Sequence, residues 1–266
     1  MEKMRIAVAI ILSFLLTSCE MIDYHPYDGR VKGDKDINRT NIAKITANCR
    51  QKDVIRFAMM GDSHRQYDET RDFVNHINKL SNVDFVIHGG DISDFGLTNE
   101  FRWVHDIMEK LTVPYIAIIG NHDVIGNGHR VYNEMYGKQN FSFIVAGIKF
   151  LCMNTNALEY DYSNPIPDFE FLETQMKDGS FDRTVAVMHS PPGSEQFNNN
   201  VKNVFQTYLK QFPGLLFCTN AHGHSTKIND LFNDGVIYYQ CSCMKKRSYL
   251  MFTIYPDSYE YEEIIF

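Results

Sequence analysis

The stretch Phe85-Val86-Ile87-His88-Gly89-Gly90-Asp91-Ile92-Ser93-Asp94 decides the fold. Its first three residues are apolar and predict a short buried strand. Two glycines end that strand and a carboxylate, Asp91, follows at once, where an open α/β sheet presents its functional groups. Gly-Gly-Asp is also ordinary turn chemistry, so this stretch alone favours a simple turn. A functional interpretation therefore depends on whether the chain repeats this pattern of an apolar strand followed directly by a possible ligand.

The pattern of a strand followed by a possible ligand recurs four times. In each case a short apolar segment ends next to a residue that carries an oxygen or imidazole ligand. The segments and the residues that follow them are 55–60 with Asp62 and His64, 114–119 with Asn121, His122 and Asp123, 184–188 with His189, and 215–219 with His222 and His224. Five such strand ends together favour a functional site over a set of unrelated turns.

The order of predicted elements indicates an α/β fold. Helices are predicted at 70–80, 98–111, 167–177 and 201–212, where apolar residues recur at helical spacing between the strands. Residues 141–154 predict a hairpin with Gly147 at its bend, and three further strands follow at 236–243, 249–255 and 259–266. Early βαβ units with a β-rich end predict two mixed sheets flanked by helices, a four-layer α/β/β/α sandwich.

Residues 1–18 are typical of a signal peptide. Lys3 and Arg5 precede an eleven-residue apolar stretch, 6–16, which is too short to span a bilayer. The residues before Cys19 resemble a bacterial lipobox, which predicts a lipidated Cys19 and an extracytoplasmic protein anchored to the membrane through that lipid. The alternative is a plain cleaved signal with an incidental cysteine. Residues 19–48 are polar and predict a tether, with a short helix near 41–49, before a domain at 49–266.

Composition narrows the choice of partners. The chain has 266 residues, enough for one domain with a full core, and a net charge of −7, which argues against a nucleic-acid backbone as the main partner. Beyond Cys19 the sequence has five cysteines, an odd number that cannot pair completely within the chain, and their spacing predicts no zinc site. The oligomeric state stays open.

The residue types at the strand ends point to a metal centre. Asp, His and Asn together suit Mn, Fe or Zn, whereas an all-oxygen set suits Mg or Ca and a thiolate set a structural zinc. Seven good ligands are present, about the number that two divalent ions need. Two ions about 3.5–4 Å apart can clamp the attacking and leaving oxygens of a displacement at phosphorus.

The five motifs, in this order, resemble the calcineurin-like metallophosphoesterases, and specifically a bacterial lipoprotein member. The motifs are Gly61-Asp62-Ser63-His64, Gly90-Asp91-Ile92-Ser93-Asp94, Gly120-Asn121-His122-Asp123, His189 and Ala221-His222-Gly223-His224. The resemblance covers residues 54–266. It implies that Asp62, His64 and His224 hold the first metal, that Asn121, His189 and His222 hold the second, and that Asp91 bridges both.

The resemblance also implies the catalytic roles. A hydroxide between the ions would be the nucleophile, His122 would protonate the leaving oxygen, and Asp123 would orient His122. Asp94 would brace the turn at Asp91 by hydrogen bonds. Two positions depart from the family pattern: Ala221 replaces a glycine, and Ser190 stands where many diester-cleaving relatives carry a second histidine. Neither departure removes a ligand, but Ser190 leaves the preferred leaving group open.

We therefore predict a metal-dependent phosphoester hydrolase that acts on small phosphodiesters outside the cytoplasm. Glycerophosphodiesters, extracellular nucleotides and phospholipid headgroups all remain open as substrates. A phosphomonoesterase or nucleotide pyrophosphohydrolase using the same site is the first alternative. A non-catalytic, metal-stabilised binding lipoprotein is the second, although a degenerate scaffold should have lost ligands.

Overall fold

A computed structural model describes residues 28–266. The predicted signal peptide and Cys19 lie outside these residues. Within them, no helix is long and apolar enough to cross a membrane. The five cysteines that the structure describes are all buried and unpaired.

Eleven strands in the described part of the chain form two mixed sheets. The first sheet has the order β11-β10-β1-β2-β3, with β1, β2 and β3 parallel and the other pairs antiparallel. Its strands are β1 (Ile55–Met60), β2 (Phe85–His88), β3 (Tyr115–Ala117), β10 (Ser248–Ile254) and β11 (Tyr259–Ile265).

The second sheet has the order β4-β5-β6-β7-β9-β8, in which β5, β6, β7 and β9 are parallel. Its strands are β4 (Phe141–Val145), β5 (Ile148–Met153), β6 (Arg183–Met188), β7 (Leu215–Asn220), β8 (Lys227–Asp230) and β9 (Ile237–Gln240).

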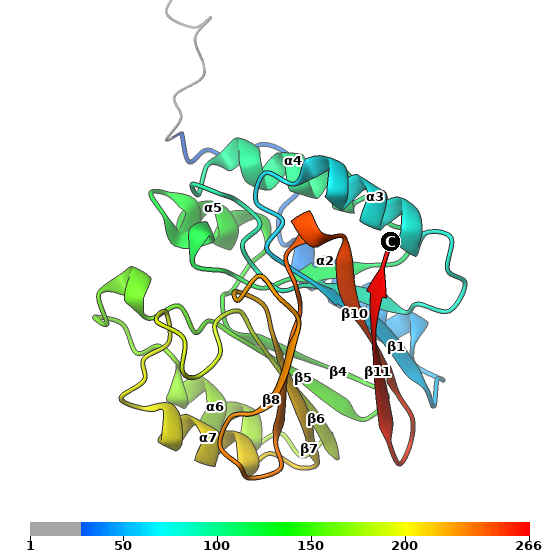
Figure 1. Ribbon diagram of the computed structural model, residues 1–266, viewed down its shortest axis with the longest axis vertical. Coiled ribbons are helices and arrows are strands. Elements are labelled where there is room, and N and C mark those ends of the chain that lie inside the picture. Colours follow the sequence, from blue (N-terminus) through cyan, green and yellow to red (C-terminus); the bar gives the residue numbers. More distant parts are fainter. Residues whose placement is uncertain (1–27) are drawn as a thin grey trace, which may run out of the picture.

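Helices cover the outer faces of both sheets (Figure 1). The helices are α2 (Ile37–Asn48), α3 (Tyr67–Ile77), α4 (Thr98–Met108), α5 (Gly128–Met135), α6 (Phe169–Met176) and α7 (Lys202–Lys210). The apolar sides of α3, α4 and α5 pack on the first sheet, and those of α6 and α7 pack on the second. The predicted four-layer α/β/β/α sandwich is confirmed.

A third apolar cluster fills the space between the two sheets. Phe57 stacks on Phe85 with ring centroids 5.3 Å apart, and both meet the edge of Phe150 from the facing sheet. Burying such rings stabilises the fold by about 1.5–3 kcal/mol for each side chain. Both faces of the central strands are therefore buried, which is why their sequences read as continuous apolar runs.

The short helix predicted near 41–49 is present but begins at Ile37, and from that residue on the segment belongs to the domain rather than to a tether. Residues 37–48 form helix α2, which packs on the domain through Ile37 and Ile45. Its Asn38 side chain exchanges hydrogen bonds of 2.8 and 2.9 Å with the backbone of Ala117, and Asn41 donates to the Tyr115 carbonyl at 2.7 Å. Asparagine amides thus satisfy the free edge of β3, which explains why the segment shows little apolar periodicity.

One α-helix and one strand were not predicted. They are helix α5 and the exposed edge strand β8, whose sequences show no helical or alternating apolar pattern strong enough to predict them. Helix α4 begins at Thr98, as predicted; its N-cap is Leu97, and the Glu100 carboxylate accepts hydrogen bonds from the amides of Phe95 and Leu97. The other predicted elements are present with ends shifted by a few residues.

Candidate metal centre

The five predicted motifs meet at one edge of the paired sheets, where β1, β2, β3, β6 and β7 end. Five of the seven predicted ligands have a left-handed backbone, with φ of 49° at Asp62, 38° at His64, 55° at Asp91, 72° at His222 and 53° at His224. Non-glycine residues adopt this conformation rarely, and such strain gathers at functional sites. The tight turns aim neighbouring side chains at a common point.

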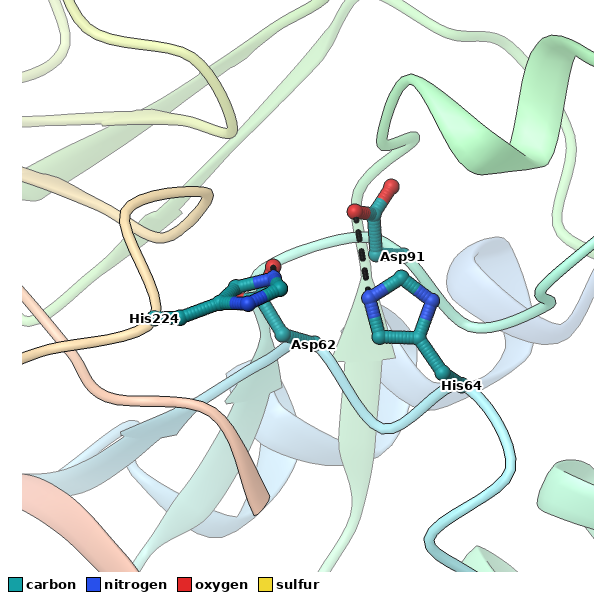
Figure 2. A group of neighbouring side chains, drawn as sticks. All are labelled: Asp62, His64, Asp91 and His224. Carbon is teal, nitrogen blue, oxygen red and sulfur yellow. Dashed lines mark ion pairs between the residues drawn. The ribbon is translucent and has the colours of Figure 1, made fainter. Parts of the chain in front are cut away.

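The first group consists of Asp62, His64, Asp91 and His224 (Figure 2). One ligand atom from each lies within 4.8 Å of all the others. His64 Nε2 is 3.5 Å from Asp91 Oδ2, and His224 Nε2 is 3.4 Å from Asp62 Oδ1. The structure thus brings together the residues predicted for the first metal and the predicted bridge.

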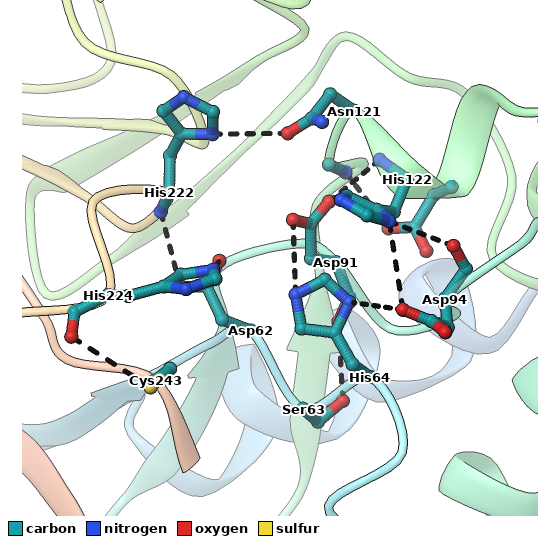
Figure 3. Close-up of polar contacts among 12 residues, drawn as sticks. Asp62, Ser63, His64, Asp91, Asp94, Asn121, His122, His222, His224 and Cys243 are labelled. Carbon is teal, nitrogen blue, oxygen red and sulfur yellow. Dashed lines mark hydrogen bonds and ion pairs between the residues drawn. The ribbon is translucent and has the colours of Figure 1, made fainter. Parts of the chain in front are cut away.

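The second group consists of Asp91, His189 and His222, with Asn121 between the two imidazoles. Figure 3 shows the contact between His222 and Asn121. Asn121 Oδ1 lies 3.0 Å from His189 Nε2 and 3.1 Å from His222 Nδ1. His189 Nε2 is also 3.3 Å from Asp91 Oδ2. All residues predicted for the second metal are therefore adjacent, again together with Asp91.

One oxygen of Asp91 faces both groups. Oδ2 is the atom near His64 and His189, whereas Oδ1 accepts a hydrogen bond of 2.9 Å from the His122 amide. The prediction that Asp91 belongs to both metal sets agrees with this geometry.

The donor set fits divalent metal ions. Asp62 is fully buried, yet its Oδ1 has no hydrogen-bond partner within residues 28–266, and the same holds for both ring nitrogens of His64. Leaving a buried polar group unpaired costs about 1–3 kcal/mol, and more for a charged group. A cation bound at the first group would coordinate Asp62 Oδ1 and one ring nitrogen of His64. Metal binding therefore accounts for these buried polar atoms, to which no group within the described residues is hydrogen-bonded.

The charges in the site depend strongly on one another. Burial alone would lower the pKa of His189, but the adjacent Asp91 carboxylate raises it to about 9. Burial opposes ionisation of Asp91, but His189 and His64 hold its pKa well below the usual range. Burial lowers the pKa of His64, against the opposing pull of Asp91. A carboxylate held ionised among imidazoles is what a cation site requires.

The acid candidate His122 lies beside the first group. Its ring meets that of His64 edge-on, with centroids 4.6 Å apart, and its side chain is 36% exposed. The ring is held by Asp94: His122 Nδ1 donates to the Asp94 carbonyl at 2.8 Å, and the Asp94 carboxylate lies 3.9 Å away. His122 lies outside the two ligand groups that contain Asp91, but with His64 and Asp94 it forms a further set of possible ligand atoms. Its role as the acid therefore stays a prediction.

The predicted role of Asp123 as the partner of His122 is wrong. The Asp123 carboxylate is buried and accepts from the amides of Gly120, Ile92 and Ser93 and from the Ser93 hydroxyl. Burial, together with the nearby Asp91 charge, raises the pKa of Asp123 to about 7. Asp123 therefore ties the Asp91 loop to the His122 loop, and Asp94 and Asp123 have exchanged the roles expected for them.

Both departures from the family pattern have a structural explanation. The Ala221 methyl fits because glycines face it: a Cβ added at Gly61 would lie 2.9 Å from it, and one added at Gly89 would lie 3.1 Å away. Ser190 is fully buried and donates to Asn156 Oδ1 at 3.0 Å. Its hydroxyl is therefore engaged by the protein and is not presented at the surface of the site.

The contacts of three residues around the site were not predicted. Asp94 contacts His64 Nδ1 at 3.6 Å and Arg65 Nε at 2.9 Å in addition to His122. Glu195 Oε1 lies 2.9 Å from His222 Nε2. The motif spacing could point to Asp94, but Arg65 and Glu195 carry no sequence signal, because long charged side chains are most often solvated surface residues.

Comparisons with known proteins agree with this site. The pattern of the family "Calcineurin-like phosphoesterase" matches residues 55–226. A probable cyclic nucleotide phosphodiesterase from Xenorhabdus bovienii is 32% identical over 66 residues, 25% of this chain and 27% of that protein. A probable glycerophosphodiester phosphodiesterase from Arcobacter nitrofigilis is 40% identical over 60 residues, 22% of each chain. The matches thus span about a quarter of these relatives.

Solved structures share the fold at low sequence identity. A dimetal phosphatase from Danio rerio superposes with a TM-score of 0.64 at 11% identity, over 79% of this chain and 95% of that one. A purple acid phosphatase from Lupinus luteus superposes with a TM-score of 0.59 at 13% identity, over 80% of this chain and 52% of that one. With the family pattern spanning most of the domain and its motifs gathered in one site, the chain belongs to the calcineurin-like phosphoesterase family.

Proposed function

We propose that this protein is a metal-dependent phosphoester hydrolase that acts on small phosphodiesters. The observation that carries the proposal is the pair of ligand groups that share Asp91 Oδ2. Asp62, His64 and His224 would hold one divalent ion, Asn121, His189 and His222 the other, and Asp91 both. When bound, two such ions supply positive charge for the phosphoester oxygens and lower the pKa of water.

The residues around the ions have separate tasks. His122 holds a proton for the departing oxygen, since its Nδ1 is bonded to Asp94 and its Nε2 is directed away from that contact. Asp94 holds His122 and His64 in place through its carbonyl and carboxylate. Asp123 joins the Asp91 loop to the His122 loop by accepting four hydrogen bonds from Ile92, Ser93 and Gly120. The aspartates thus preorganise the site before substrate binds.

Small phosphodiesters are the proposed substrates because the matched relatives are named for them, a cyclic nucleotide in one case and a glycerophosphodiester in the other. Both alignments are short, so the names support the bond type rather than a particular molecule. The complete ligand set argues against a non-catalytic binding protein, because loss of catalysis relaxes the need for every ligand. Mn, Fe and Zn remain the proposed metals, since the donors mix imidazole with oxygen.

We expect hydrolysis to depend on added metal. The purified protein should cleave bis(4-nitrophenyl) phosphate, lose that activity after chelation, and regain it with Mn, Fe or Zn. Mg or Ca should restore it poorly, because both proposed ligand groups are rich in imidazole nitrogens, which these two ions bind weakly. Release of nitrophenolate would be followed before and after dialysis against chelator. Full activity in protein shown by elemental analysis to be metal-free would contradict the proposal.

We also propose that Cys19 is lipidated and anchors the protein outside the cytoplasm, on the strength of the sequence before it. Cys19→Ala should release the protein from the membrane fraction or block its maturation, because a lipid supplies the proposed anchor. Fractionation followed by intact-mass measurement tests this. A Cys19→Ala protein that stays with membranes at the normal mature mass would show that the lipobox interpretation is wrong.

A further inference from the structure

Each imidazole of the second group has one nitrogen directed at Asn121 and one directed outward. A neutral imidazole carries its proton on one nitrogen only, and a metal needs the lone pair of the other. The partner of the outward nitrogen therefore decides whether the inward nitrogen is ready to bind. The partners of His189 and His222 differ in kind.

The outward nitrogen of His189 faces the main chain. His189 Nδ1 lies 2.7 Å from the Gly89 carbonyl, which can only accept, so Nδ1 carries a proton and Nε2 is the nitrogen left to bind a metal. This arrangement is built into the fold, because the carbonyl belongs to the loop that follows β2. No side-chain substitution can remove it.

The outward nitrogen of His222 faces a side chain. His222 Nε2 lies 2.9 Å from Glu195 Oε1, and a carboxylate also accepts only. A proton on Nε2 satisfies this shorter contact with a charged acceptor, and it leaves Nδ1, 3.1 Å from Asn121 Oδ1, as the nitrogen that would bind the second metal. The His222 side chain is 14% exposed and that of Glu195 is 71% exposed, so Glu195 approaches the buried ring from the surface.

The loop that carries Glu195 is tied to the protein directly after it. Gln196 is buried, its side chain donates to Glu159 Oε1 at 2.8 Å, and its carbonyl accepts from the Leu158 amide at 3.2 Å. These contacts hold the backbone at Glu195 near His222 without using its carboxylate.

We propose that Glu195 is a positioning residue that prepares His222 for the second metal by fixing its tautomer and ring orientation. The inference rests on the proposed function, since it concerns the second metal of that site. Carboxylates bonded to metal-binding imidazoles raise metal affinity, and their loss costs about 10–100-fold. Glu195 acts through His222 and need not touch substrate.

The test is a calorimetric titration of metal-free protein with Zn. For Glu195→Ala we expect the affinity of one of two sites to fall by about 10–100-fold, with the other unchanged. Glu195→Gln keeps an accepting oxygen and should lose less. Glu173→Ala is the matched control, because Glu173 accepts a hydrogen bond from Tyr208 at 2.8 Å on an exposed helix surface, and its loss should leave both affinities unchanged.

A second readout reports the tautomer directly. In ¹⁵N NMR of the metal-free protein, His222 should carry its proton on Nε2, and Glu195→Ala should shift the population toward Nδ1. Equal Zn affinities and equal His222 tautomers in the wild-type and Glu195→Ala proteins would overturn the inference while leaving the proposed hydrolase intact. Failure of the wild-type protein to bind a second ion would instead overturn the proposed function on which it rests.

Discussion

Asp91→Asn should remove metal and turnover together. Asp91 Oδ2 lies 3.5 Å from His64 and 3.3 Å from His189, so one negative charge serves both groups. An amide has the same shape but no charge, and it presents an NH₂ group to one side of the site. We expect metal affinity to fall by more than the roughly 100-fold that follows loss of an outer-shell partner. Elemental analysis and hydrolysis of a nitrophenyl diester would be measured on the same sample.

Asp84→Asn is the matched control for this variant. Asp84 is also buried, but it pairs with Lys52 and accepts from the Arg56 amide, away from the metal centre. Its substitution should reduce stability without changing metal content. An Asp91→Asn protein that keeps its metal ions and turns over normally would show that Asp91 is not the shared ligand.

His122→Ala should separate proton transfer from metal binding. His122 contributes its backbone amide to Asp91, but its ring belongs to neither of the two groups proposed to hold metal, so both ions should stay bound. Loss of a general acid typically lowers kcat by ~10²–10⁴-fold. The loss should be greatest for an alkyl leaving group of high pKa, because that oxygen needs a proton, and much smaller for nitrophenolate. The measurement compares kcat for an alkyl and a nitrophenyl diester.

The control for this comparison is His129→Ala, on helix α5 and outside the ligand groups, which should change neither the ratio of the two kcat values nor the metal content. Equal losses on both diesters in His122→Ala would remove His122 from the acid role and leave it a purely electrostatic one. Loss of a metal ion in that variant would show that the ligand set proposed here is wrong.

The strand-end cluster and the layered fold could be predicted because their signals are local. Each proposed ligand follows an apolar strand within a few residues, and parallel strands deliver their ends to one edge of a sheet. Placing Asp62 and Asp91 together therefore needed no knowledge of the tertiary structure. His189 follows β6 of the other sheet, so its place beside Asp91 was implied by the family resemblance. The start of helix α2 and its packing on the domain were misjudged for the opposite reason, since Asn38 and Asn41 bond to backbone groups of β3, 79 and 74 residues away in sequence.

The roles of Asp94 and Asp123 could not be separated from sequence. Both are aspartates on loops that border the same site, and which one meets His122 depends on how the two loops pack. Gly120 decides this packing: a Cβ there would lie 2.1 Å from the Asp91 amide, so the loops approach closely and bury the Asp123 carboxylate between them. Glu195 was missed because it meets His222 across 27 residues from a loop with no recognisable motif.

A crystal structure of the metal-loaded protein, with anomalous scattering recorded at the metal absorption edge, would test the central claim most directly. Two anomalous peaks are expected at the strand ends, about 3.5–4 Å apart. One should lie among Asp62, His64 and His224, the other among Asn121, His189 and His222, with Asp91 between them. A single peak, or peaks away from Asp91, would contradict the account.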